Sequence, residues 1–477
     1  MARLFLIIFL YNLSAITSLH ALPSGMTVVA GTVSSSFANN TLQLIVSDGA
    51  VVEWTDFSIN ASETVQLIQP TTSATALFQV TGANMSQLLG SLEANGAVCV
   101  INEQGLLVGT TGNVAAESFI GSTLTLANNL FTQGIDLQFS GSSTAVVIQL
   151  GTISVNAGML ALLSHQIDNR GSLTSPGGTL ALLSGHNYTI NTSFIPNINV
   201  QANLPGEGIS NSGPVEALHV YLEADRSAGV AIRQNEGITL LEEGGNLTLA
   251  TSGGAIMLAY GANLTAPAGS VSIQATSTSN AERIYLFGAV DASGSSGGSI
   301  SIQGDHILHA GSVNANGTNH VAGTITIQAA QSFLGTELGS TSANAPNNGG
   351  AISLFGTSLL AAGNHYTSAG TIHILGEQIS LISANVNASG NVTGGQILIG
   401  GGVQGSNPHI PNAQSVFIAP TTTISANGSY TGGTIVVWSE LETENFGILS
   451  SSGPVQGHID VASRGVLVQK GTLILGL

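Results

Sequence analysis

The chain has 477 residues, only 7% of them charged, and 25 acidic against seven basic side chains give a formal net charge of −18. No basic cluster is present, which excludes a nucleic-acid-binding protein and a protein held electrostatically on anionic lipid. An apolar fraction of 43% excludes a disordered chain. A surface this poor in charge must be covered by small polar residues and by the 61 glycines. The composition therefore favours an exported all-β repeat protein.

The first 21 residues have the pattern of a secretory signal peptide. Arg3 provides a short basic start, residues 4–13 form an apolar core, and a cleavage site is predicted after Ala21. The core is shorter than the roughly 20 residues that cross a membrane. No later segment has 18 uninterrupted apolar residues. We expect an exported mature protein without a membrane span.

Short strands broken by turns are predicted from residue 26 to about residue 139. Residues 41–46, 50–54 and 64–68 alternate as strands do, and Asp48-Gly49 is a two-residue hairpin signal. Between residues 77 and 109, apolar runs of about five residues or fewer are separated by Gly/Asn corners. The strand spacing is irregular here, as is typical of a capping region with extra antiparallel strands.

From residue 157 a short unit recurs at intervals of about 20–27 residues. It consists of a glycine pair or an Ala-Gly pair, one variable residue and an alternating apolar strand. Clear copies begin at residues 157, 177, 253, 268, 297, 322, 349, 369, 394 and 432. One such coil cannot bury its own apolar side chains, so the coils must stack. The glycines mark a corner where a left-handed φ or a close backbone approach excludes a Cβ. The pattern predicts a β-solenoid.

These patterns divide the chain into the signal peptide (1–21), an N-terminal region with the cap (22–195), a middle segment (196–245) and a repeat rod (246–477). In the middle segment the repeat weakens, prolines interrupt it and charged residues concentrate. We predict an irregular charged excursion there, with an ordinary loop insertion favoured over a binding site.

An ordered series of motifs runs through the chain. The motifs are LPSGMTVVAG (22–31), VVEWTDFSI (51–59), VTG (80–82), SQLLG (86–90), LEANG (92–96), VINEQGLLVG (100–109), NPHIPNAQSVF (407–417) and GGTIVVWS (432–439). Together they resemble the N-terminal secretion domain and haemagglutination-activity region of the filamentous haemagglutinin family, the exoproteins of two-partner secretion. The resemblance covers most of residues 22–465.

The resemblance implies an all-β, right-handed parallel β-helix, with residues 22–195 as the two-partner-secretion and haemagglutination-activity domain. It implies export through the periplasm and a partner that is an outer-membrane barrel transporter. It places the protein outside the cell or on its outer surface. It also implies an adhesin or haemagglutinin, for which host-cell surface glycans or receptors are candidate partners.

The same resemblance singles out two corners as candidate secretion motifs. Family members usually have Asn-Pro-Asn-Gly where this chain has residues 102–105, Asn-Glu-Gln-Gly. Asn102 and Gly105 match, and Asn95 and Gly96 form the preceding corner. The absent proline predicts a less rigid turn at residues 102–105.

Residues typical of catalysis or metal binding are scattered. His306 and His309 are three apart in a predicted strand, so they face opposite sides and cannot bind one metal ion. His365 and His373 are separated by a turn. We expect surface or loop positions for these histidines, no enzymatic activity, and neither a cofactor nor a metal.

Two further features carry predictions. The single cysteine, Cys99, lies in an apolar run and is predicted to be a small buried core residue, without a disulfide or metal role. Glu440, Glu442 and Glu444 alternate on one strand face, where a solvated edge is favoured over a cation site.

Two alternative functions stay open. A β-helix can carry a polysaccharide lyase or hydrolase, although such enzymes need paired carboxylates or an Asp/Lys/Arg cluster on one face. The chain could also be the truncated stalk of a larger toxin-delivery exoprotein. Residues 472–477 form an apolar strand without a polar cap, which favours truncation or an interaction through that end.

Overall fold

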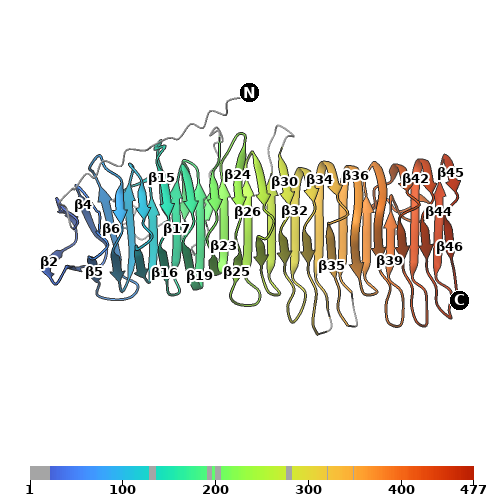
Figure 1. The fold of residues 1–477 in the computed structure, drawn as a ribbon, viewed down its shortest axis with the longest axis horizontal. Helices are drawn as coiled ribbons and strands as arrows, with labels where there is room; N and C mark the ends of the chain where they lie inside the picture. The colour runs from blue at the N-terminus through green and yellow to red at the C-terminus, as the bar shows by residue number, and fades with distance from the viewer. Residues whose placement is uncertain are drawn as a thin grey trace, which may run out of the picture.

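The computed structural model describes residues 22–127, 136–190, 196–198, 206–275, 282–319, 321–346 and 349–476. These residues form a long rod of stacked coils, in which the chain advances steadily from one end to the other (Figure 1). Nearly all strand pairs are parallel, and each coil contributes a strand to each of three ladders. The fold is a parallel β-helix, as the repeat predicts.

The three ladders are here called faces A, B and C, in the order in which the chain visits them. Face A contains β4 (Ala50–Trp54), β6 (Thr75–Val80), β9 (Ala97–Asn102), β12 (Ser118–Ser122), β17 (Met159–Ser164), β26 (Asn246–Thr251), β29 (Ser270–Ala275), β37 (Thr371–Leu375), β39 (Gln396–Ile399) and β44 (His458–Ser463). Face B contains β7 (Ser86–Leu88), β10 (Leu106–Val108), β15 (Val146–Gln149), β18 (Gln166–Asn169), β22 (Ile209–Asn211), β24 (Val230–Gln234), β27 (Ala255–Leu258), β30 (Arg283–Leu286), β40 (Ala413–Ile418) and β45 (Val466–Gln469).

Face C contains β3 (Thr41–Val46), β5 (Thr64–Ile68), β8 (Ser91–Ala94), β11 (Asn113–Ala116), β16 (Thr152–Val155), β25 (Ile238–Leu240), β28 (Asn263–Thr265), β31 (Ala289–Asp291), β33 (Ser312–Asn314), β35 (Ser340–Ala343), β41 (Thr423–Ser425), β43 (Ile448–Ser450) and β46 (Thr472–Ile474). Long strands bend at a corner and serve more than one face. They are β19 (Ser172–Ser184), β23 (Val215–Ala224), β32 (Ser299–His309), β34 (Thr324–Gly335), β36 (Ala351–Thr367), β38 (Gln378–Asn387) and β42 (Thr434–Asn445).

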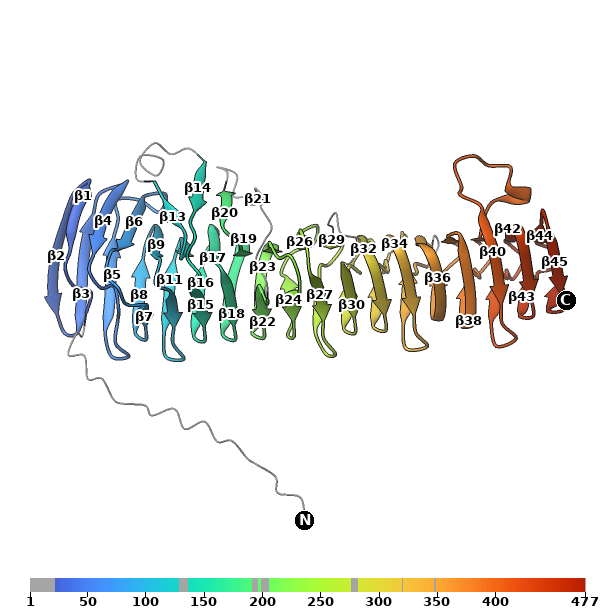
Figure 2. The same cartoon turned by 90° about the horizontal axis from the view of Figure 1, so that it is seen from above.

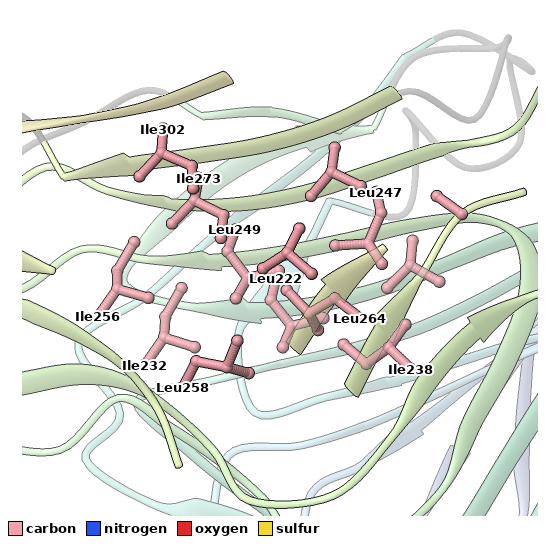
Figure 3. Close-up of a cluster of buried hydrophobic side chains, with 14 of the residues drawn as sticks. Leu222, Ile232, Ile238, Leu247, Leu249, Ile256, Leu258, Leu264, Ile273 and Ile302 are labelled. Carbon is pink, nitrogen blue, oxygen red and sulfur yellow. The ribbon is translucent and has the colours of Figure 1, made fainter. Parts of the chain in front are cut away.

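Aliphatic side chains from all three faces fill the inside of the rod (Figure 3). On face A, one register position is aliphatic in coil after coil. It is occupied by Val220, Leu247, Val271, Ile300, Ile325, Ile352, Ile372, Ile397 and Ile435. Each of these side chains is 2% exposed or less. Because coils stack at about 4.8 Å, each side chain covers the next, and a single coil has no core of its own.

A column of glycines forms the corner between faces C and A. It includes Gly245, Gly269, Gly298, Gly323, Gly350, Gly370, Gly395 and Gly433. A Cβ on Gly323 or Gly350 would lie 1.8 Å from the carbonyl oxygen of the glycine one coil earlier. None of these column glycines has a left-handed φ. Close approach of neighbouring backbones, and not a special φ, therefore requires glycine at this corner.

Antiparallel strands occur at the N-terminal end and beside the rod, as expected. There β1 (Thr27–Ala30) pairs with β4, and β2 (Val33–Ala38) pairs with β3. A side sheet of β13 (Thr125–Leu126), β14 (Leu137–Ser140), β20 (Asn187–Ile190) and β21 (Pro196–Ile198) lies against the outside of the early coils (Figure 2). Beneath it, a second apolar cluster that includes Ile120, Phe139 and Leu183 joins the sheet to face A.

The hairpin predicted at Asp48-Gly49 is wrong. β3 and β4 do not pair with each other, because β3 lies on face C and β4 on face A. Asp48 Oδ1 instead accepts a hydrogen bond of 2.9 Å from Thr75 N of the next coil, and Gly49 takes a φ of +67°. Stacking on the following coil overrides the local turn signal.

Residues 209–240 also differ from the predicted irregular excursion. Here β22, β23, β24 and β25 continue the ladders in register with the coils on either side. The charged residues are accommodated without leaving the rod. Arg226 is fully buried, and Arg233 forms a 2.6 Å ion pair with Glu207. The residues at 191–195 and 199–205, and the signal segment, lie outside the described parts of the chain.

The loop predicted around Pro408 and Pro411 leaves the rod between β39 and β40, where it contains the short 3₁₀ helix η1 (Val403–Gly405). Figure 2 shows it projecting from the rod in orange. Across the described residues, no helix is long and apolar enough to pass through a membrane.

Candidate functional site

The two candidate secretion corners lie at opposite ends of one strand, β9. Asn95 and Gly96 precede the strand, and Asn102 and Gly105 end it and turn the chain toward β10. Six residues of strand separate the corners by roughly 20 Å, so the structure does not bring them into one cluster. They instead frame the outer surface of β9.

Asn102 closes the later corner with its side chain. It is 1% exposed, and its Nδ2 donates hydrogen bonds of 2.9 Å to Asn84 O and Ser86 Oγ of the preceding coil. Its Oδ1 accepts a 2.9 Å hydrogen bond from Gln104 N, which forms an Asx turn. Gly105 completes the turn with a φ of +118°. Four residues thus form an ordered corner that leaves the side chains of Glu103 and Gln104 exposed.

The earlier corner is held by a reciprocal pair of side-chain amides. Asn95 accepts from Gln69 N at 2.7 Å and donates to Gln69 O at 2.9 Å. The buried Gln69 side chain accepts from Gly96 N and donates to Ala74 O. A Cβ on Gly96 would lie 2.5 Å from Ala74 O, so this position also requires glycine. Sequence reasoning found Asn95 and Gly96 but missed Gln69, whose signal was only the Gln-Pro pair at 69–70.

Beside β9, the outer surface of face A holds an apolar hollow of about 350 Å³. Cys99, Ile120, Leu137 and Met159 line it, and Glu117 stands at its polar rim. Cys99 is 3% exposed, and burial raises the pKa of its thiol far above the usual range. The prediction that Cys99 is a buried core residue is confirmed, and a thiol that stays protonated is a poor nucleophile and metal ligand.

A polar cluster beneath the side sheet was not foreseen. Arg226 donates to the carbonyl oxygen of His165 and, at 2.7 Å, to Ser184 Oγ. Next to it, burial raises the pKa of Glu223 to about 7. Burial also lowers the pKa of His165, with smaller contributions from the positive charges of Arg226 and His186. Arg226 lies 61 residues from His165 and 42 from Ser184, so no local sequence pattern predicts these contacts.

The predicted surface or loop positions are wrong for two histidines. His309 and His365 are fully buried, and burial lowers their pKa values to about 4 and about 3. His306 lies on the outer side of the same strand, where its Nδ1 is 2.7 Å from Ser332 Oγ, so the predicted opposite facing of His306 and His309 is confirmed. In the described part of the chain no group of His, Cys, Asp and Glu is arranged to hold a metal ion.

The three glutamates near residue 440 do not share one face, because β42 bends between Ser439 and Glu442. Glu440 accepts hydrogen bonds from Asn412 at 2.9 Å and Arg464 at 3.1 Å. Its carboxylate is therefore engaged within the protein, and only Glu442 and Glu444 lie together on face B.

One carboxyl pair is brought together by the stacking of coils. Glu282 and Asp305 are 23 residues apart and both are less than 9% exposed. Burial and a side-chain hydrogen bond from Glu282 raise the pKa of Asp305. Carboxyl groups that bond directly are closer than the 5 Å or more that separates the pair of a typical glycosidase. The sequence signal for this pair is its separation of 23 residues, which corresponds to one coil.

The TPS secretion domain family model matches residues 20–258. The chain belongs to this family. The match covers half of the sequence and includes both corners of β9. Exoproteins of two-partner secretion pass through the periplasm to the cell surface or the medium, and their secretion domain implies an outer-membrane transporter as partner.

Two curated relatives from Haemophilus influenzae are both named heme/hemopexin-binding protein. One is 26% identical over 223 residues, which is 43% of this TPS exoprotein and 24% of the relative. The other is 32% identical over 77 residues, or 16% of this chain and 8% of the relative. The chain thus spans about a quarter or less of the length of these relatives.

Two solved structures are similar at lower identity. The HMW1 secretion domain from Haemophilus influenzae has a TM-score of 0.39 at 19% identity, over 95% of this chain and 100% of that one. The filamentous hemagglutinin secretion domain has a TM-score of 0.31 at 12% identity, over 83% and 99% of the two chains.

Proposed function

We propose that this TPS exoprotein is an adhesin-like binding protein, which an outer-membrane transporter recognises through the coils around β9 and which then presents the lateral faces of its rod to a cell surface. The observation that carries the proposal is the exposure of large apolar side chains along the rod. Tyr260, Leu338, Val392 and Tyr430 are each more than 60% exposed. Val392, Tyr430 and the exposed Val455 lie side by side on successive coils, which hydrogen-bond to one another at these positions, and contiguous exposed apolar side chains mark contact surfaces.

The recognition part of the proposal rests on the two corners of β9. Their polar clamps fix turns that are individual to these coils, and the later corner leaves the side chains of Glu103 and Gln104 exposed. Deletion of residues 26–121 should abolish release into the medium in cells that also make the partner transporter. Release that persists after this deletion would overturn the assignment of the recognition site. A rod deletion of one whole coil, residues 322–348, is the control and should be released.

The binding part is tested with purified protein on epithelial cells and erythrocytes. We expect saturable cell binding or agglutination by the full chain. Absence of both, with correctly folded protein, would contradict the adhesin-like role. A panel of polysaccharides incubated with the same protein tests the lyase or hydrolase alternative, since reducing ends or unsaturated products would favour an enzyme.

Haem binding is a second candidate, and the match to relatives named for heme and hemopexin supports it. Titration of hemin into the purified protein should then produce a shifted Soret band at one equivalent. A spectrum that equals the sum of free hemin and protein would remove this candidate. Such a result would leave the adhesin-like role standing.

A further inference from the structure

Three aromatic rings form a strip on the outer surface of face B. Tyr260 stacks on Phe287 with 5.0 Å between ring centroids, and Tyr285 lies 6.3 Å from Phe287 with ring planes only 10° apart. Tyr260 is 67% exposed, so one side of its ring is open to solvent. The strip combines residues from two successive coils, which is why their spacing in the sequence did not reveal it.

A free guanidinium group lies on the same surface. Arg283, Tyr285 and Phe287 alternate with the buried Ile284 and Leu286, so all three project outward. Every other arginine among the described residues has a partner. Arg170, Arg233 and Arg464 form ion pairs. Arg226 is buried and donates hydrogen bonds, one of them to Ser184 Oγ. Arg283 is exposed, and no ion pair joins it to another residue in the described part of the chain. Four residues of strand place it about 13 Å from Phe287.

A second arginine lies on face B, and its charge is balanced by an ion pair. Arg233 occupies face B two coils before, where its Nη1 lies 3.2 Å from Met257 Sδ, and Met257 is the register partner of Tyr285. Glu207 fixes the Arg233 side chain in this position. The carboxyl group of Glu282, the residue before Arg283, is buried and hydrogen-bonded to that of Asp305. In a chain of net charge −18, Arg283 thus offers an anion a positive charge that no ion pair within the described residues balances.

The aromatic rings and the guanidinium group together indicate the chemistry of the ligand. Aromatic faces pack against the apolar side of a sugar ring, and tyrosine hydroxyls supply hydrogen bonds at the rim. A guanidinium binds a carboxylate through two parallel hydrogen bonds. An added β-strand is not accommodated here, because the backbone groups of β30 are already paired with β27 and β32 on both sides.

We propose that Arg283, Tyr285, Phe287 and Tyr260 form a binding site for an oligosaccharide that carries a carboxylate, with the carboxylate on Arg283 and the adjoining ring over the aromatic strip. This deepens the proposed adhesin-like function and rests on it for its biological meaning.

The experiment measures binding of defined sugars to the full purified chain by calorimetry. The probes are a hexuronate tetrasaccharide, its carboxyl-reduced neutral counterpart, sialyllactose and lactose. We expect binding of one or both acidic probes and little binding of the neutral ones, and the two acidic probes distinguish a uronate from a sialic acid. Arg283→Gln should weaken the binding of the acidic probe about tenfold and remove the preference for that probe over its neutral counterpart. Tyr260→Ala should weaken the binding of the acidic probe by about the same factor.

Matched variants control for general effects. Arg170→Gln and Phe37→Ala change an exposed arginine and an exposed aromatic ring elsewhere, and both should bind as the unaltered chain does. Failure of both acidic probes to bind, or binding by the Arg283→Gln and Tyr260→Ala variants as tight as by the unaltered chain, would overturn the site. Cell binding measured in parallel separates the two proposals. If the Arg283→Gln and Tyr260→Ala variants still bind cells, this site is not the one that attaches to cells, and the adhesin-like role stands. If the unaltered chain binds acidic sugar but no cells, the adhesin-like role is rejected and the sugar site stands.

Discussion

The corner between faces C and A is closed by different means around β9 and in the later rod. Before β9, Asn95 and the buried Gln69 hold the turn through reciprocal amide hydrogen bonds. From Gly245 onward the corner between faces C and A is closed by stacked glycine backbones. Side-chain clamps are individual, whereas the glycine column is the same in every coil. The difference shows that the turn before β9 is individual, whereas the rod repeats one glycine corner from coil to coil, so we expect the transporter to recognise the N-terminal coils.

The glycine column is the place where the largest effect is expected. Gly350→Ala would place a Cβ 1.8 Å from Gly323 O, a backbone atom that cannot move without disturbing the stack. We expect a loss of about 4 kcal/mol in the free energy of unfolding, measured by urea denaturation. Gly237→Ala is the control, because its Cβ would have no neighbour nearer than 3.8 Å. Equal denaturation midpoints for the two variants would show that close packing does not require the glycine.

The buried histidines make the rod sensitive to acid. The pKa of His309 is lowered to about 4 in the folded chain, so below about pH 6.5 the unfolded chain takes up a proton that the folded chain does not. Stability is therefore full above pH 6.5 and falls as the pH drops toward 4, by about 3 kcal/mol for this group. His309→Leu, which matches the neighbouring Leu286, should flatten this part of the stability profile. An unchanged profile, equal to that of the loop variant His409→Ala, would contradict the interpretation.

Removal of the Asn102 side chain should have an intermediate effect. Asn102→Ala abolishes two donated hydrogen bonds and one accepted bond at a buried corner. We expect a loss of about 2 kcal/mol in the free energy of unfolding. Gln104→Ala changes an exposed side chain in the same turn and should cost far less. If both substitutions have the same small effect in urea denaturation, Asn102 does not hold the corner.

Surface charge should matter least. The ion pair between Arg170 and Asp168 is 2.7 Å long, but the arginine side chain is 65% exposed. We expect Arg170→Ala to change the free energy of unfolding by at most about 0.5 kcal/mol. A shift in the thermal midpoint as large as that of Asn102→Ala would mean that exposed ion pairs stabilise the coils as much as buried side chains do, which would contradict this expectation.

The fold could be predicted from the sequence because its signal repeats. The Gly-x-apolar unit recurs in nearly every coil after residue 157, and the observed ladders follow it strand by strand. The Asp48-Gly49 turn was misread because a two-residue hairpin and a corner between coils share the same residue types. The charged segment near Arg226 was misread because partners such as His165 and Ser184 lie far away in sequence.

The site was only partly predictable for a related reason. Asn102, Gly105, Asn95 and Gly96 could be named because turn residues are recognisable locally. Gln69, the Glu282–Asp305 pair and the aromatic strip depend on which coil stacks on which. That register is a property of the assembled rod and has no local signature. The sequence predicts surface positions for His309 and His365, because a polar residue in an alternating strand usually faces water.

The central claim, that the corners of β9 are read by the transporter, is tested most directly by comparing release of two equivalent variants. Asn102 and Asn445 are both buried, and each holds a corner with its side-chain amide, Asn445 through Gln469 and Gly447. Release into the medium is measured as the secreted fraction in cells that make the transporter. The account predicts that Asn102→Ala lowers this fraction severalfold more than Asn445→Ala, although both cost about 2 kcal/mol of stability. Equal release of the two variants would contradict it.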